Sequence, residues 1–354
     1  MDKYRIDTHK LIYHPERVSD WLKNKNVYPI YAEISPSGAC NHRCSYCALD
    51  FMEYKPRFLD AKMLKVRFKE MAGLGLKSLM FAGEGEPFLH PDMAAISVHA
   101  NKCGIDTSFT TNAVLMKPAV IDRILPTTSW IKVSISGGTP VTYSQIHRCG
   151  PGDFATVFSN LGYAAALKKK KGYSCTLGMQ MVLLPENAHE AVELARKARD
   201  AGMDYLVIKP YSQHPLSVTD KYRKIRYASF DKLATELEKI NRPGFSVIFR
   251  QNTMRKWDEG RRPYARCLAL PFWTYIDAGG NVWGCSMFLQ NEKFRYGNIN
   301  ERTFRQIWEG NKRRRSLACV RKMDATRCRV NCRMDEINRY LWELRSPAGH
   351  SNFI

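Results

Sequence analysis

Three cysteines share one short loop, and their spacing is that of an iron–sulfur ligand set. Cys40, Cys44 and Cys47 follow one another in C-x3-C-x2-C order, directly after an apolar, β-prone run at 31–35. Three thiolates on one loop can ligate three corners of a cubane [4Fe–4S] cluster and leave the fourth iron open for chemistry. A zinc site usually brings four protein ligands with C-x2-C pairs, and the sequence places no other ligand beside these cysteines except His42. The pattern favours a cluster with an open position, with zinc as the alternative.

A second group of four cysteines lies near the C-terminus. Twelve residues, Gly280 and four further residues separate Cys267 from Cys285, and Cys328 and Cys332 follow after another 42 residues. Four thiolates complete a tetrahedral ligand set, which fits either zinc or a second [4Fe–4S] cluster. Because four ligands leave no open iron, we expect such a cluster to relay electrons and not to anchor a substrate.

Composition limits where this chemistry takes place. The 354 residues include 11 cysteines, an odd number, and the start MDKYRIDTHK has no apolar signal core, which argues against a disulfide framework. No run approaches the ~20 apolar residues of a membrane span, so we expect a cytoplasmic protein. The net charge of +21 favours an anionic partner, such as a phosphorylated metabolite, an acidic peptide, nucleic acid or an acidic membrane surface.

The elements that must position these cysteines can be read from the hydrophobic pattern. We expect strands at 31–35, 78–82, 107–110, 130–136, 175–184 and 205–209, and helices at 60–72, 91–102, 118–124, 154–171 and 188–201. Six strand-and-helix repeats predict parallel strands with right-handed crossovers, a curved sheet with helices outside, and ligands at the carboxyl ends of the strands. Further along, we expect a helix near 230–240, a β-hairpin of 272–276 and 282–285 that turns at 278–281, and helices at 303–309 and 335–344.

With Tyr46 as the aromatic residue before its last cysteine, the loop resembles the signature of the radical S-adenosylmethionine (SAM) enzymes. The resemblance implies that the open iron chelates the amino and carboxylate groups of SAM. The reduced cluster of such enzymes cleaves SAM to a 5′-deoxyadenosyl radical, which takes a hydrogen atom from the substrate. The implied fold is an α/β, partial (β/α)6 TIM-like barrel, in agreement with the strand count.

The resemblance also implies contacts to SAM at the strand ends. The run Gly83-Glu84-Gly85-Glu86-Pro87 resembles the family's GGEP motif, although the same letters can also form a simple turn. The expected cofactor-binding residues are Tyr46, Gly83, Gly85, Glu86, Pro87, Asn112, Ser134, Ser136, Gln180, Lys209 and Tyr211. Many relatives carry Asp where this chain has Ser136, so Ser134 is the better candidate for a ribose or carboxylate contact.

The C-terminal cysteines resemble the SPASM/Twitch extension of radical SAM enzymes, together with a GNI run at 297–299 and an IW pair at 307–308. The chain lacks the C-x2-C-x5-C run of a full SPASM set, so we expect a small α+β domain with one auxiliary [4Fe–4S] cluster. Cys319 is expected to be a buried thiol. The predicted organisation is an N-terminal extension at 1–28, the barrel at 29–215, a linker and helical segment at 216–260, and the auxiliary iron–sulfur domain at 261–354.

The fate of the substrate radical stays open between two outcomes. Cys149, expected near the barrel mouth, would return a hydrogen atom in an epimerase, whereas electron transfer to the auxiliary cluster would give a two-electron oxidation. In either case we expect a flavodoxin- or ferredoxin-type protein to supply the electron that starts the reaction.

The sequence is compatible with three kinds of substrate or partner, to different degrees. The positive charge favours an anionic small molecule, such as a phosphate-bearing activated sugar, and only 39 residues precede Cys40, too few for a leader-peptide-binding domain. A ribosomal peptide maturase with a separate recognition protein is the alternative. A basic nucleic-acid-binding protein with structural zinc or iron–sulfur sites is disfavoured, because it explains neither the open ligand position nor the GEGEP run.

Overall fold

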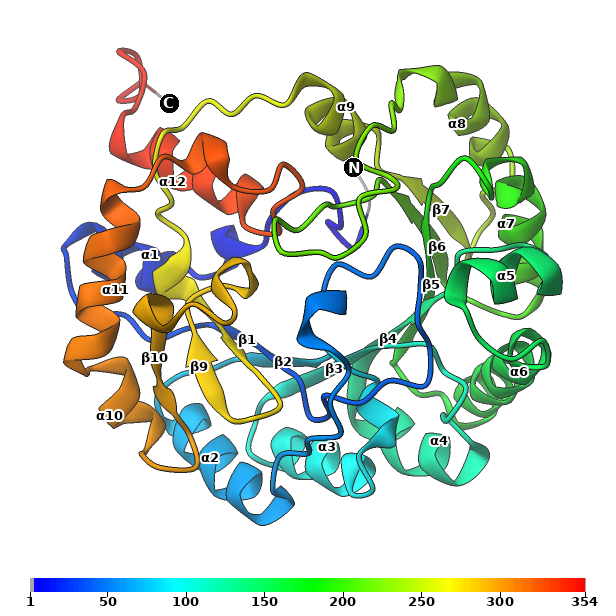
Figure 1. Ribbon diagram of the computed structural model, residues 1–354, viewed down its shortest axis with the longest axis horizontal. Coiled ribbons are helices and arrows are strands. Elements are labelled where there is room, and N and C mark those ends of the chain that lie inside the picture. The colour runs from blue at the N-terminus through cyan, green and yellow to red at the C-terminus, as the bar shows by residue number, and fades with distance from the viewer. Residues whose placement is uncertain (1–2, 354) are drawn as a thin grey trace.

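The computed structural model describes residues 3–353. Ten strands form one sheet in the order β10-β9-β8-β1-β2-β3-β4-β5-β6-β7. The strands are β1 Tyr31–Ile34, β2 Ser78–Phe81, β3 Asp106–Thr111, β4 Thr128–Ser134, β5 Thr176–Val182, β6 Tyr205–Lys209, β7 Ser246–Phe249, β8 Trp273–Ile276, β9 Asn281–Trp283 and β10 Arg295–Asn298. The sheet curves into an open ring with most helices outside it (Figure 1). The fold is therefore the mixed α/β, partial-barrel architecture that the sequence predicts.

Two strand pairings extend the sheet beyond the six expected strands. β7 pairs in parallel with β6, although its residues lie in the segment 216–260 that was expected to be a linker with a helix. β8 pairs in parallel with β1, so the expected hairpin of β8 and β9 is present but continues the barrel sheet. Both pairings cover a strand edge that would otherwise expose unpaired backbone groups, and neither is local in sequence.

The helices match the hydrophobic periodicity, with four additions. Their bounds are α1 Pro15–Leu22, α2 Ala61–Gly73, α3 Met93–Lys102, α4 Pro118–Ile124, α5 Pro140–His147, α6 Asp153–Lys171, α7 Ala191–Asp200, α8 Asp231–Glu238, α9 Gln251–Glu259, α10 Phe304–Trp308, α11 Asn311–Lys322 and α12 Asp335–Arg345. The helices α1, α5, α9 and α11 were not expected from the sequence. Among them, α5 starts at a proline in its first turn, and the many charges of α11 hide its apolar face.

The alternation of side chains along the strands separates two environments. In β4, Ile131 and Val133 are fully buried in the core between the sheet and the outer helices. Successive strand residues point to opposite faces, so Lys132 and Ser134 face the inside of the ring. Polar groups therefore line the barrel interior, while the main apolar core lies outside it. None of the helices in the described range 3–353 is long and apolar enough to span a bilayer.

Candidate active site

The loop with the first three cysteines leaves β1 and runs along the barrel mouth. The backbone N–H groups of Arg43 and Ser45 donate to the carbonyls of His147 and Ile146, at 3.1 and 2.8 Å, which ties the loop to the end of α5. Burial and the neighbouring thiols Cys47 and Cys40 raise the pKa of Cys44 well above its ordinary value. The three thiols are thus close enough to interact electrostatically, in an environment that disfavours free thiolates.

The spacing of the cysteine sulfurs tests which group fits. Four sulfurs around a tetrahedral zinc ion, with Zn–S distances of ~2.3 Å, would lie ~3.8 Å apart. In the part of the chain that the structure describes, no three cysteine sulfurs lie within 4.8 Å of one another. Both cysteine groups are therefore spread more widely than zinc requires. This spread, together with burial of the thiols, fits the corners of a [4Fe–4S] cluster.

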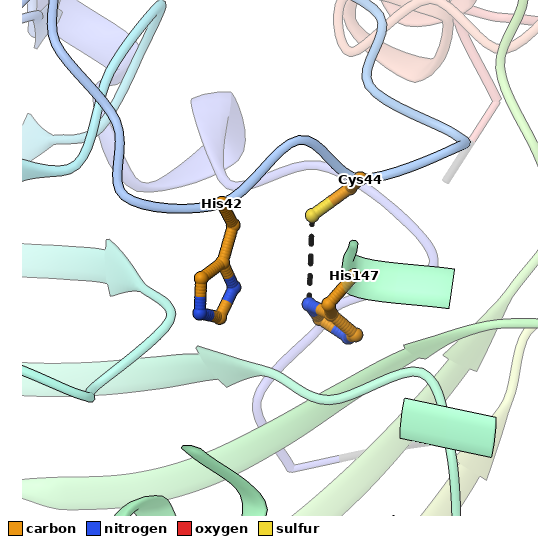
Figure 2. A group of neighbouring side chains, drawn as sticks. All are labelled: His42, Cys44 and His147. Carbon is orange, nitrogen blue, oxygen red and sulfur yellow. Dashed lines mark hydrogen bonds between the residues drawn. The ribbon is translucent and has the colours of Figure 1, made fainter. Parts of the chain in front are cut away.

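A histidine that the sequence analysis did not single out contacts this loop. His147, at the end of α5, lies 3.5 Å from the Cys44 sulfur through its Nδ1 atom (Figure 2). Its Nε2 accepts the backbone N–H of Ser136 at 2.9 Å, so the ring proton of the neutral imidazole is on Nδ1 and points at sulfur. Burial lowers the pKa of His147 well below its usual value, which keeps the ring neutral. No spacing rule connects residues 44 and 147, so this contact could not be predicted from the sequence.

The GEGEP run packs directly against the cysteine loop. A Cβ atom on Gly85 would lie 2.3 Å from the carbonyl oxygens of both Ser37 and Ala39, so only glycine allows this approach. Gly83 has a φ of +103°, and a Cβ there would lie 1.7 Å from the Ser35 hydroxyl oxygen. Pro87 begins a short 3-10 turn, Pro87–Leu89. Packing within the chain thus explains why both positions are glycine, independently of any role in SAM binding.

The two glutamates of this run take different positions. The Glu86 carboxylate accepts the Thr111 hydroxyl at 2.5 Å and the Asn112 N–H at 2.8 Å, and burial raises its pKa to about 7. Glu84, which the sequence analysis left without a role, accepts the N–H of Ala278 in the β8–β9 turn at 2.7 Å. Burial also raises the pKa of Glu84 to about 7. One glutamate thus joins the run to β3 and the other joins it to the C-terminal hairpin.

The other residues expected to contact SAM divide by location. The Asn112 amide donates to the Asn41 side chain at 2.7 Å, which places it against the cysteine loop. Ser134 and Gln180 are paired across β4 and β5.

Two of the remaining residues that were expected to contact SAM are buried and form hydrogen bonds within the chain. Ser136 is fully buried, where its hydroxyl accepts the N–H of Val182 at 3.2 Å. Tyr211 is 1% exposed and donates its hydroxyl to Gln213 at 3.0 Å. Tyr46 packs edge-on against His147 with ring centroids 5.7 Å apart. The role of each of these residues toward SAM stays a prediction.

All four C-terminal cysteines line one cavity of about 180 Å³. Its apolar wall consists of Leu49, Leu270, Trp273, Met287, Phe288, Val320, Met323 and Met334. Asn338 on α12 braces the first ligand, because its oxygen accepts the N–H of Leu268 at 2.6 Å while its amide faces the Cys267 sulfur at 3.6 Å. A cavity of this kind fits a cluster better than a single ion. Cys319, expected to be buried, is exposed on the charged helix α11 and does not line this cavity.

This cavity also reaches the barrel. Its walls include Ala48, directly after the last cysteine of the first loop, and Glu33, on the inward face of β1. Arg329 and Arg333, which directly follow Cys328 and Cys332, line the cavity as well. The cavity of the C-terminal cysteines therefore extends to the residues that directly follow the first cysteine loop.

Cys149 lies just beyond α5, beside Asp153 and His42. Burial and the Asp153 carboxylate raise the pKa of Cys149 to about 12, so it is a neutral thiol, the form that carries a hydrogen atom. The side chain is partly buried against the main apolar core and lies close to the first cysteine loop through His42. Its role in hydrogen return stays a prediction.

Comparisons with known proteins agree with the fold and the ligand sets. Residues 34–198 match the radical SAM superfamily, and residues 267–333 match the iron–sulfur cluster-binding domain SPASM. The chain therefore contains a radical SAM domain and a C-terminal SPASM domain. These two domains imply SAM and [4Fe–4S] clusters as cofactors.

Individual relatives are more distant. The chain is 26% identical over 215 residues to a GTP 3′,8-cyclase of Rhizobium leguminosarum bv. trifolii, an alignment that covers 59% of each chain. It is 29% identical over 144 residues to a PqqA peptide cyclase of Ruegeria pomeroyi, covering 40% of this chain and 37% of that protein. The alignments thus span less than two thirds of these relatives. The fold is similar to that of Streptococcus suis SuiB bound to precursor peptide SuiA, with a TM-score of 0.67, 18% identity, and coverage of 88% and 71%.

Proposed function

We propose that the protein is a radical SAM peptide maturase that removes two hydrogen atoms from a peptide and joins two of its atoms. The observation that carries this proposal is the cavity that all four C-terminal cysteines line and that extends to Ala48 and Leu49, directly after the first cysteine loop. When bound, SAM and the first cluster supply a 5′-deoxyadenosyl radical, and the second cluster accepts the electron that the substrate gives up.

The electron balance favours oxidative bond formation over inversion. The first hydrogen leaves the peptide as an atom, and the new bond releases the second as a proton and an electron. A cluster held by the four cysteines that line the interior cavity would accept that electron. These cysteines are Cys267, Cys285, Cys328 and Cys332. Inversion would instead need a hydrogen donor such as Cys149, which lies beside His42 of the cysteine loop, and it would give the C-terminal ligand set no part in the reaction.

The relatives favour a peptide over a sugar. The PqqA peptide cyclase is a sequence relative, and the similar SuiB structure holds a precursor peptide. Neither the expected activated sugar nor the dehydrogenase or epimerase reaction finds support among the relatives described above, whose names are those of cyclases. The flavodoxin- or ferredoxin-type reductant stays a prediction.

The test is an anaerobic turnover assay with reconstituted protein, dithionite, SAM and a randomised pool of short peptides. We expect 5′-deoxyadenosine together with peptides lighter by two hydrogen atoms, measured by mass spectrometry. Cys332→Ala should still form 5′-deoxyadenosine but lose the lighter peptides, and the triple variant Cys40→Ala/Cys44→Ala/Cys47→Ala should form neither. Conversion of GTP or an activated sugar in parallel reactions, with no peptide changed, would refute the proposal.

A further inference from the structure

Two lysines project into the barrel from either side of β5. Lys132 alternates in β4 with Ile131 and Val133, whose side chains pack on the outer core. Lys209 ends β6 directly after Ile208, which also packs outward. In Figure 1, β4 and β6 flank β5 on the inner wall of the ring. By the alternation of strand side chains, both ammonium groups face the interior.

Two arginines that act electrostatically on both lysines are already paired with acidic groups. Glu33 pairs with Arg333 at 3.0 Å, and Asp7 pairs with Arg250 at 2.9 Å. Within residues 3–353, neither Lys132 nor Lys209 forms an ion pair or a hydrogen bond through its ammonium group. The contact found for Lys132 is with the ring of Trp130, whose centroid is 5.3 Å from Nζ. The interior therefore holds cationic groups in excess.

The charges around the pair show the same imbalance. Burial, followed by Arg333 and Arg250, lowers the pKa of Lys132 to about 7. Burial and the neighbouring cations, Lys132 first among them, lower the pKa of Lys209 well below its usual value. These surroundings favour the neutral amine, whereas a bound anion favours the charged ammonium and supplies the partner that the chain does not provide. Such a feature is expected where a ligand brings the missing charge.

We propose that Lys132 and Lys209 bind a carboxylate of the peptide substrate. This inference rests on the proposed function and adds that the peptide presents an acidic residue to the barrel interior. The carboxylate of SAM is a less suitable occupant, because the cysteine loop and the GEGEP run lie beyond the strand ends. Lys132 lies two residues before the end of β4, ~7 Å deeper along the strand, whereas Lys209 is the last residue of β6.

The test measures binding and not turnover, so its failure is distinct from failure of the maturase proposal. The probe is N-acetyl-L-glutamate N-methylamide, with the glutamine analogue as the uncharged control, titrated into SAM-loaded holoprotein and followed by ligand-observed NMR. We expect the glutamate probe to bind and Lys132→Met and Lys209→Met each to raise its dissociation constant at least tenfold. Lys170→Met, which removes an exposed charge at the end of α6, should leave the constant unchanged.

Two further measurements separate the pair from a structural or cofactor role. Lys132→Met should not lower the melting temperature, because an apolar chain replaces a cation without a partner, and it should leave SAM affinity unchanged. A lower melting temperature with unaltered probe binding, or a loss of SAM affinity, would overturn the assignment. So would equal binding of the glutamine analogue. Inorganic phosphate is then added as a competitor of the glutamate probe. If its dissociation constant is lower than that of the probe, the site binds phosphate and the carboxylate proposal is refuted.

Discussion

His147 is expected to tune the reduction potential of the cluster that Cys44 would ligate. Its Nδ1–H points at the Cys44 sulfur at 3.5 Å, and its other nitrogen is engaged by the backbone of Ser136. A hydrogen bond to a ligating thiolate stabilises the more negative, reduced state more than the oxidised state. Replacing His147 by Phe removes this donor while an aromatic ring can still stack on Tyr143, whose ring centroid is 4.1 Å away. The potential should therefore become more negative.

The size of the shift follows from the strength of the lost bond. A hydrogen bond to a charged acceptor contributes ~1.5–3 kcal/mol, and the N···S distance of 3.5 Å places this one at the weaker end. One added electron is spread over the whole cluster, so about a third to a half of that energy, ~0.5–1 kcal/mol, distinguishes the two redox states. For a one-electron couple, ~59 mV corresponds to ~1.4 kcal/mol, so the expected shift is about 20–45 mV.

The measurement is a potentiometric titration of reconstituted protein, monitored by the electron paramagnetic resonance signal that responds to SAM. His147→Gln is the matched control, because its amide can donate to Cys44 and accept from Ser136, and it should restore most of the potential. Thermal unfolding of His147→Phe is measured separately, since the unpaired N–H of Ser136 costs ~1–3 kcal/mol of stability. Equal potentials for wild type, Phe and Gln proteins, or a positive shift in the Phe protein, would refute the reasoning.

Three other predictions concern the ligands and the loop that supports them. Cys332→Ala should lower the iron content of reconstituted protein from about eight to about four per chain by elemental analysis, whereas zinc at this site in the wild type would contradict the second cluster. Gly85→Ala should destabilise the fold by about 1–3 kcal/mol in denaturant titrations, because its Cβ would lie 2.3 Å from two carbonyl oxygens, while Gly73→Ala, with open space around it, should be neutral or slightly stabilising. Because the pKa of Glu84 rises from 4.5 to about 7 on folding, unfolding releases its proton between these values and stability falls as pH rises through them. Glu84→Gln should therefore gain about 2–3 kcal/mol over wild type at pH 8 and lose this advantage near pH 4.5, and an advantage that is constant with pH would contradict the assignment.

The sequence predicted the parts of the fold that depend on local pattern. The six barrel strands and the β8–β9 hairpin were expected within a few residues, because alternation, turn residues and apolar runs are properties of neighbouring positions. The pairings of β7 with β6 and of β8 with β1 were missed, since no local signal shows which distant strand will cover an exposed edge. Helix α11 was missed because its arginines and lysines outnumber the few apolar residues that anchor it.

The site divides in the same way. The cysteine ligands and Glu86 could be found because each belongs to a motif whose chemistry is visible in its spacing. His147 and Glu84 could not, because their contacts to Cys44 and Ala278 join residues more than one hundred positions apart. These two contacts determine how the motif residues are held, and only the folded chain brings them together.

Net charge shows most clearly what burial adds to sequence. The run Lys168–Lys171, a conspicuous basic cluster in the sequence, ends α6, where cations favourably oppose the helix dipole and where Lys168 pairs with Asp204 at 2.5 Å. Its last three members are exposed to water, which screens them, so they reveal little about a partner. Lys132 is unremarkable in the sequence, and Lys209 was expected there to contact SAM, yet both face a partly dry interior without an acidic partner in the described chain. A lysine therefore indicates a ligand only where the fold buries it away from solvent. The net charge of +21 does not show which lysines are buried in this way.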